Sequence, residues 1–124
     1  MYQLGLQRDF IARHYLIGGD FGAENIEHSH AYRVEVRLSG EMLNRHGYLV
    51  DLVVLEQAVE KVVARFRDRC LNELPEFAGL NPSLEHFCRI LYQELKRCSE
   101  LGGLALTVRL WENPHAWASY GDRC

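Results

Sequence analysis

Polar and apolar residues alternate in the first forty positions, which is the pattern of β-strands that bury one face. In the first segment, the even positions from Tyr2 to His14 carry most of the apolar side chains. In the second segment, one face is made of His28, His30, Tyr32, Val34, Val36 and Leu38. A loop with three glycines, residues 15–27, joins the two segments, and we expect the strands to form an antiparallel hairpin.

Helical spacing follows in the middle of the chain. Apolar residues recur every three or four positions from Leu52 to Phe66, which predicts an amphipathic helix over 51–69. Asn81-Pro82 is a suitable N-cap and first-turn pair for a second helix, which Gly102-Gly103 would end. Alternation returns over 104–112 and, after Pro114, over 116–120, which predicts two more strands.

The order ββααββ predicts an α+β fold in one domain, residues 1–124, with two helices covering one face of a four-stranded antiparallel sheet. A sheet this short leaves two open edges. Open edges are commonly hidden by pairing between subunits, so we expect a homo-oligomer.

Composition narrows the class of protein. The chain has 124 residues, 48% of them hydrophobic, which is enough for a core without disulfides. The net charge of −3 and the lack of a basic stripe argue against a nucleic-acid partner. There is no long apolar run, no signal-peptide pattern and no Cys-x-x-Cys pair among the four cysteines. We therefore expect a cytoplasmic protein without a membrane partner.

Three histidines are the main candidates for chemistry. Period-2 geometry places His28 and His30 on the same face of the second strand. If the hairpin forms, His14 projects from the same face at the same end. Three imidazoles are the ligand set of a catalytic zinc site with one open coordination position. The alternative is that the histidines are polar sheet residues without a metal.

Carboxylates supply the remaining candidates. Glu112 continues the inward phase of 104–110, so it is either a carboxylate at the edge of the core, suited to two N–H groups of a planar heterocycle, or a solvated residue beyond the strand. Glu24 and Glu27 lie just before the paired histidines, and each is either an acid–base group or a loop charge. Asp68 lies between two arginines, which is typical of a solvated surface pair.

These residues resemble the family of 6-pyruvoyl-tetrahydropterin and 6-carboxy-tetrahydropterin synthases. The resemblance covers nearly the whole chain and rests on motifs in this order: Phe10-Ile-Ala-Arg-His14, His28-Ser-His30, Gly47-Tyr-Leu-Val-Asp51, Leu71-Asn72, Asn81-Pro82-Ser83 with Glu85, and Glu112 with Ala116 and Tyr120. Each motif is short, but together their order and spacing are specific.

The resemblance implies a tunnelling fold, in which subunits join their sheets into a barrel, often as a hexamer. It implies zinc on His14, His28 and His30, and a pterin at a subunit interface anchored by Glu112. Ser83, in place of the family's threonine, is a second candidate for binding the substrate. The usual substrate is 7,8-dihydroneopterin triphosphate, whose side-chain hydroxyls the zinc would acidify.

The departures from the family concern catalysis. Glu24 stands four residues before the histidine pair, where the family has its proton-handling cysteine. The family's aspartate–histidine pair corresponds to Arg67-Asp68, or to Asp68-Arg69 with a one-residue shift, so Asp68 is a second catalytic candidate but the Cys–Asp–His relay is absent. A branch with glutamate at the cysteine, usually at the position of Asn25, cleaves the side chain to 6-hydroxymethyl-7,8-dihydropterin.

The sequence therefore predicts a zinc-dependent pterin lyase with Glu24 as base and Glu112 as pterin anchor. The alternative from another class is a catalytically silent homologue that keeps the zinc and pterin sites. A scaffold without metal is the third option.

Overall fold

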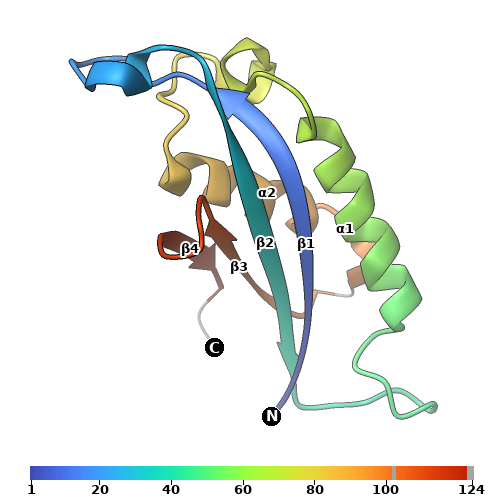
Figure 1. Cartoon of the computed structure of the whole chain (residues 1–124). Helices are drawn as coiled ribbons and strands as arrows, with labels where there is room; N and C mark the ends of the chain where they lie inside the picture. Colours follow the sequence, from blue (N-terminus) through green and yellow to red (C-terminus); the bar gives the residue numbers. More distant parts are fainter. Residues whose placement is uncertain (102, 123–124) are drawn as a thin grey trace.

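A computed structural model describes residues 1–101 and 103–122 and confirms the predicted order of elements (Figure 1). The strands are β1 (Tyr2–His14), β2 (His28–Gly40), β3 (Ala105–Trp111) and β4 (Trp117–Gly121). The helices are α1 (Leu52–Phe66) and α2 (Leu84–Lys96), with short 3-10 turns η1 (Gly22–Asn25), η2 (Leu71–Glu73), η3 (Pro75–Phe77) and η4 (Ser99–Leu101). None of the described helices has the length and apolar character needed to cross a membrane.

The four strands form one antiparallel sheet in the order β1-β2-β3-β4. β1 and β2 pair along their whole length, from Tyr2 opposite Gly40 to His14 opposite His28. β3 pairs with β2 only from Arg33 to Ser39, so the first five residues of β2 extend beyond the end of β3. Both helices lie on one face of the sheet, α1 near β1 and α2 across β3 and β4 (Figure 1).

Both predicted helices end earlier than expected. α1 stops at Phe66 instead of residue 69, because Asp68 adopts a left-handed backbone (φ 62°) and its N–H donates to the carbonyl of Ile11 at 2.7 Å. α2 stops at Lys96, since the N–H of Cys98 turns back to the carbonyl of Leu95 and starts a 3-10 turn. Gly102, which was predicted to end this helix together with Gly103, lies outside the described residues, as does Cys124.

The predicted N-cap of α2 is also wrong. Ser83 is the N-cap, and its hydroxyl accepts a hydrogen bond from the N–H of His86 at 3.2 Å. The side chain of Asn81 instead accepts from the N–H of Ile17 at 2.8 Å. The loop after β1 therefore takes the side chain that the sequence pattern assigned to the helix.

Phe87 of α2 is the centre of the core. Its ring contacts Phe10 of β1, Tyr32 of β2, Phe66 of α1 and Phe77 of η3, with centroids 5.2–5.9 Å apart and rings packed edge to face. Phe87 is fully buried. Because one ring contacts four elements, it holds the two helices and the hairpin in one packing arrangement.

Asp122 fastens the C-terminal end of β4 to α2 and β3. Its carboxylate accepts from Lys96 Nζ at 2.6 Å, from the hydroxyl of Tyr92 and from the N–H of Leu106 at 3.0 Å. The hydrogen bond from Lys96, followed by that from Tyr92, lowers the pKa of Asp122 to about 2. The ionised form is thus favoured by folding.

We predict that Asp122→Asn lowers the free energy of unfolding by about 1 kcal/mol at pH 7, a modest value because the ion pair is partly exposed. The folded pKa lies below the unfolded one, so this contribution is present above about pH 4 and disappears as pH falls through 2. Urea unfolding at pH 7 and pH 2.5 measures it. Asp9→Asn, which removes an exposed pair with Arg33, should cost less than about 0.5 kcal/mol. A loss for Asp122→Asn that is equal at both pH values would contradict this role.

Candidate metal centre

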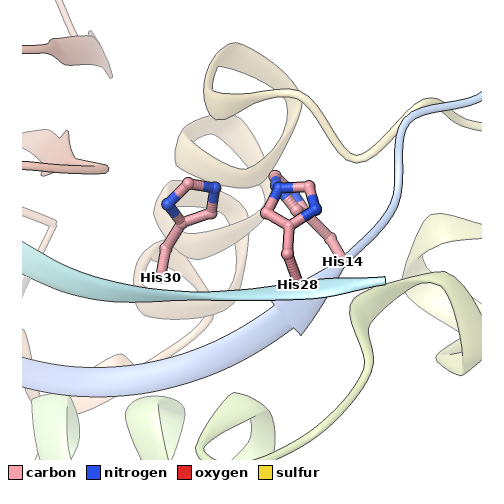
Figure 2. Close-up of side chains that lie close together, drawn as sticks. All are labelled: His14, His28 and His30. Carbon is pink, nitrogen blue, oxygen red and sulfur yellow. The ribbon is translucent and has the colours of Figure 1, made fainter. Parts of the chain in front are cut away.

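The register of the β1–β2 hairpin brings three imidazoles together. His14 lies directly opposite His28, and His30 follows two residues later on the same face. Their ring centroids are 4.6–4.9 Å apart, and one nitrogen from each ring lies within 4.8 Å of the other two. Figure 2 shows the three side chains rising from the same side of the hairpin. The convergence predicted from strand geometry is confirmed.

Backbone carbonyls determine which ring nitrogens are free. His14 Nδ1 is 2.9 Å from the carbonyl oxygen of Pro82, and His28 Nδ1 is 2.7 Å from that of Ile26. A carbonyl oxygen only accepts, so each Nδ1 carries the hydrogen and each neutral ring presents a lone pair at Nε2. The two Nε2 atoms are 3.0 Å apart. Two facing lone pairs at this distance need a shared cation, either a proton or a metal ion.

His30 offers the third nitrogen. Its Nε2 is buried and makes no hydrogen bond in the described part of the chain. Leaving a buried polar atom without a partner costs about 1–3 kcal/mol. Three imidazole nitrogens, two of them backed by carbonyl oxygens, are a donor set that fits zinc or a similar divalent metal.

Burial favours the neutral, metal-binding form of two of the imidazoles, those of His14 and His30. His14 is 2% exposed, and burial is the main cause that lowers its pKa. Burial also lowers the pKa of His30, against the smaller opposing effect of the Glu112 charge. Metal ligation requires a neutral ring, so a lowered pKa favours occupancy at neutral pH.

Tyr32 forms the floor of the site and connects it to the core. Its hydroxyl lies 3.4 Å from His14 Nδ1, and its ring packs edge to face against His30. Burial raises its pKa, so the hydroxyl stays protonated. On the other side the ring stacks on Phe10, 5.5 Å away. The alternation of β2 predicts Tyr32 on the inward face, two residues after His30, but an aromatic residue at an inward position does not by itself indicate a site.

Two asparagines hold the chain where it leaves β1. The Asn72 side chain accepts from the N–H of Tyr15 at 2.9 Å and donates to the carbonyl of the same residue at 2.8 Å. Asn81 accepts from the N–H of Ile17. The segment after His14 has no sheet partner, so side-chain amides satisfy its backbone groups and fix the direction in which His14 enters the site.

A third asparagine organises the loop that carries Glu24. The Asn25 amide donates to the carbonyls of Leu16 and Gly19 at 3.0 and 3.1 Å and accepts from the N–H of Phe21 at 2.7 Å. A carboxylate could not make the two donor contacts. The Asn25 side chain therefore holds the loop together and is not free for catalysis. Glu24 is exposed, and its side chain makes no hydrogen bond in the described part of the molecule.

Glu112 is the first residue after β3 and lies on the side of β2 where the first residues of that strand pair with β1 but not with β3. Its side chain is 24% exposed, and Oε1 is 3.0 Å from His30 Nε2 and 3.9 Å from His14 Nε2. Of the two placements that the sequence allowed, the structure has the one at the edge of the core. A carboxylate thus faces the nitrogens of the cluster.

Among the described residues, no hydrogen bond or ion pair joins the side chains of the other predicted residues to the histidines. Asp68 is exposed beside the outer edge of β1, where residues 68–70 bond to the end of that strand, and no hydrogen bond or ion pair joins its side chain to the cluster among the described residues. Glu27 pairs with Arg13 at 3.1 Å and groups with Cys70 instead. The Ser83 hydroxyl serves as the helix N-cap. Of the predicted carboxylates in the described part of the chain, Glu112 is the one that forms ion pairs with the cluster, through His30 and His14.

Comparisons with known proteins agree with this arrangement. The family model for 6-pyruvoyl tetrahydropterin synthase matches residues 3–123. A putative 6-carboxy-5,6,7,8-tetrahydropterin synthase of Archaeoglobus fulgidus is 32% identical over 115 residues, 93% of this chain and 91% of the relative. The 6-carboxy-5,6,7,8-tetrahydropterin synthase of Haemophilus influenzae is 22% identical, covering 98% of this chain and 100% of the relative.

Solved structures show the same fold. The 6-pyruvoyl tetrahydropterin synthase of Caenorhabditis elegans superposes with a TM-score of 0.81 at 24% identity, covering 99% of this chain and 98% of that one. A Plasmodium vivax 6-pyruvoyltetrahydropterin synthase, a variant whose catalytic glutamate is replaced by alanine, also has a TM-score of 0.81, at 17% identity and with the same coverage. The predicted four-stranded α+β tunnelling fold is confirmed.

We predict that Asn72→Asp destabilises the protein by about 1–3 kcal/mol, because the new oxygen faces the carbonyl of Tyr15 where an N–H donor stood. Denaturant unfolding measures the change. Asn44→Asp is the matched control, since Asn44 only accepts, from the N–H groups of His46 and Tyr48, and Asp keeps both bonds. Equal stabilities of the two variants would show that the amide donor of Asn72 is dispensable.

Proposed function

The chain belongs to the 6-pyruvoyl tetrahydropterin synthase family, and on this premise we propose that it is a zinc-dependent lyase acting on 7,8-dihydroneopterin triphosphate or a close relative. The observation that carries the proposal is the meeting of three imidazole nitrogens whose lone pairs have no hydrogen-bond donor among the described residues. The family match supplies the substrate class, and the cluster supplies the metal site.

His14, His28 and His30 would hold the zinc. Bound there, zinc supplies Lewis acidity that lowers the pKa of hydroxyl groups on the substrate side chain. The carbonyls of Pro82 and Ile26 keep two of the rings in the ligating tautomer. Tyr32 closes the site from below and excludes water on that side.

Glu24 is the base in this proposal. It lies on η1, whose position is set by Asn25 and by the bond from the N–H of Leu16 to the Glu24 carbonyl at 2.8 Å. A carboxylate accepts protons and suits general-base catalysis. The Plasmodium vivax relative, in which a glutamate is described as the catalytic residue, supports a glutamate in this role.

Glu112 is the proposed anchor for the pterin ring. An ionised carboxylate can accept two parallel N–H bonds from a planar heterocycle. The carboxylate lies beyond the end of β3, where the first residues of β2 have β1 on one side and no strand on the other. A flat ring placed there would have its side chain directed toward the histidines.

Assembly is part of the proposal. We infer a homo-oligomer that joins the open edges of β1 and β4 and places the pterin at a subunit interface. Asp68 lies on the β1 edge, away from the histidines of its own chain. A catalytic role for Asp68, and likewise any substrate contact of Ser83, would then depend on how neighbouring subunits complete the site.

This site could form either of two products. The names of the curated relatives favour a 6-carboxy-tetrahydropterin. Glutamate in place of the cysteine favours cleavage to 6-hydroxymethyl-7,8-dihydropterin, because a carboxylate cannot take every role of a thiolate. Product analysis by mass spectrometry after incubation with dihydroneopterin triphosphate separates the two.

The second candidate function is a zinc- and pterin-binding protein without catalysis. The absence of the Cys–Asp–His relay favours it. Tight pterin binding in calorimetry together with no product at high enzyme concentration would identify the binder. Any zinc-dependent product identifies the lyase.

We predict that the purified protein binds one zinc per chain and that His28→Ala weakens binding at least about 100-fold, because one of three ligands is lost. Competition with a chromogenic chelator measures the affinity. His115→Ala removes an exposed histidine outside the cluster and should leave zinc affinity unchanged. Undiminished affinity in His28→Ala would exclude the cluster as the metal site.

We further predict that Glu24→Gln lowers turnover by about 10²–10⁴-fold, the usual contribution of a general base. Zinc content should stay the same, because Glu24 is not among the three ligands. Glu27→Gln is the matched control, since Glu27 precedes the same histidines but pairs with Arg13. Full activity in Glu24→Gln would remove Glu24 from the mechanism.

A further inference from the structure

We propose that Glu112 is the fourth ligand of the metal in the substrate-free protein, and that it gives up this position when it binds the pterin ring. The inference rests on the proposed function and adds a second partner for the same carboxylate. The carboxylate and the three imidazoles would then form a closed set of four ligands.

The distances fit a shared ion better than a direct bond. Ligand atoms at about 2.1 Å from a tetrahedral zinc lie about 3.4 Å from one another. Glu112 Oε1 is 3.0 Å from His30 Nε2 and 3.9 Å from His14 Nε2, values on either side of this separation. His30 Nε2 nevertheless makes no hydrogen bond among the described residues. The carboxylate therefore faces the imidazole without the alignment that a hydrogen bond requires.

The negative charge of Glu112 is an independent reason to expect a cation beside it. Glu112 is half-buried, and in the described part of the chain it forms no ion pair with a lysine or arginine. A partly buried carboxylate needs a positive partner or several donors. A divalent cation held by His14, His28 and His30 is positioned to be that partner.

The backbone around Glu112 limits where the carboxylate can go. The N–H of Glu112 donates to the carbonyl of Ala116 at 3.1 Å, and the Asn113 side chain accepts from the N–H groups of His115 and Ala116. This closed turn fixes the Cα of Glu112 beside the histidines. Rotation about side-chain bonds is then the motion that remains for moving the carboxylate between partners.

The two partners compete because each uses the same oxygen. A pterin ring that donates two N–H groups engages both carboxylate oxygens, which withdraws Oε1 from the cluster. Glu112 would thus keep other ligands out of the fourth position until the heterocycle arrives. By linkage, the metal and the bare ring must weaken each other's binding by one common factor.

The first test compares zinc affinity in the wild type and in Glu112→Gln by chelator competition. We expect about a tenfold loss in the variant, and a changed visible spectrum when cobalt replaces zinc. Glu60→Gln, which removes the same charge from the surface of α1, should match the wild type in both. Equal affinity and an identical cobalt spectrum in Glu112→Gln would overturn the inference.

The second test titrates unsubstituted pterin, which lacks the side-chain hydroxyls, into metal-free and zinc-loaded wild type by calorimetry. We expect binding to be about tenfold tighter without zinc, the size of a typical coupling between sites. Equal binding, or tighter binding with zinc, would refute the exchange. Retained zinc binding that depends on His28 but not on Glu112 rejects this inference alone, whereas zinc binding independent of His28 rejects the proposed function.

Discussion

Two imidazole lone pairs that face each other across 3.0 Å are the constraint on which this structure depends. The pairing of His14 with His28 at the end of the hairpin brings the rings together, and a carbonyl behind each ring determines its tautomer. The arrangement is unfavourable without a positive charge between the nitrogens. This partly buried pair of nitrogens, held by the hairpin register and by two backbone carbonyls, points to a bound cation.

The surroundings hold this arrangement from two sides. From below, Tyr32 connects the rings to Phe87, which contacts four other elements through aromatic packing. From above, Asn72 and Asn81 bind the backbone of the segment that leaves β1. Displacement of His14 would require changes in the core or in these amide contacts. The ligands therefore have little freedom before a metal binds, which lowers the entropy cost of binding it.

The carboxylates near the site differ in environment, and the proposed roles follow from that difference. The Glu24 side chain is exposed on a loop, makes no hydrogen bond in the described structure and is suited to exchanging protons. Glu112 is half-buried against the histidines and suited to holding a partner. The Asp68 side chain is exposed beside the end of β1, and a catalytic role for it would depend on the proposed assembly of subunits.

Period-2 alternation in the sequence by itself determined the inward faces of the strands, the shared face of His28 and His30, and the inward phase of Glu112, because side-chain direction along a strand depends on local geometry. The meeting of His14 with this pair also required the register of the hairpin. Tertiary structure decided what residue type does not encode. The carbonyls of Pro82 and Ile26 determine the tautomers of His14 and His28, and every residue has such a carbonyl. The Asn81 side chain bonds to Ile17, 64 residues away, and Ser83 caps α2 in its place. Such choices depend on which groups meet in space, and only the packed fold brings them together.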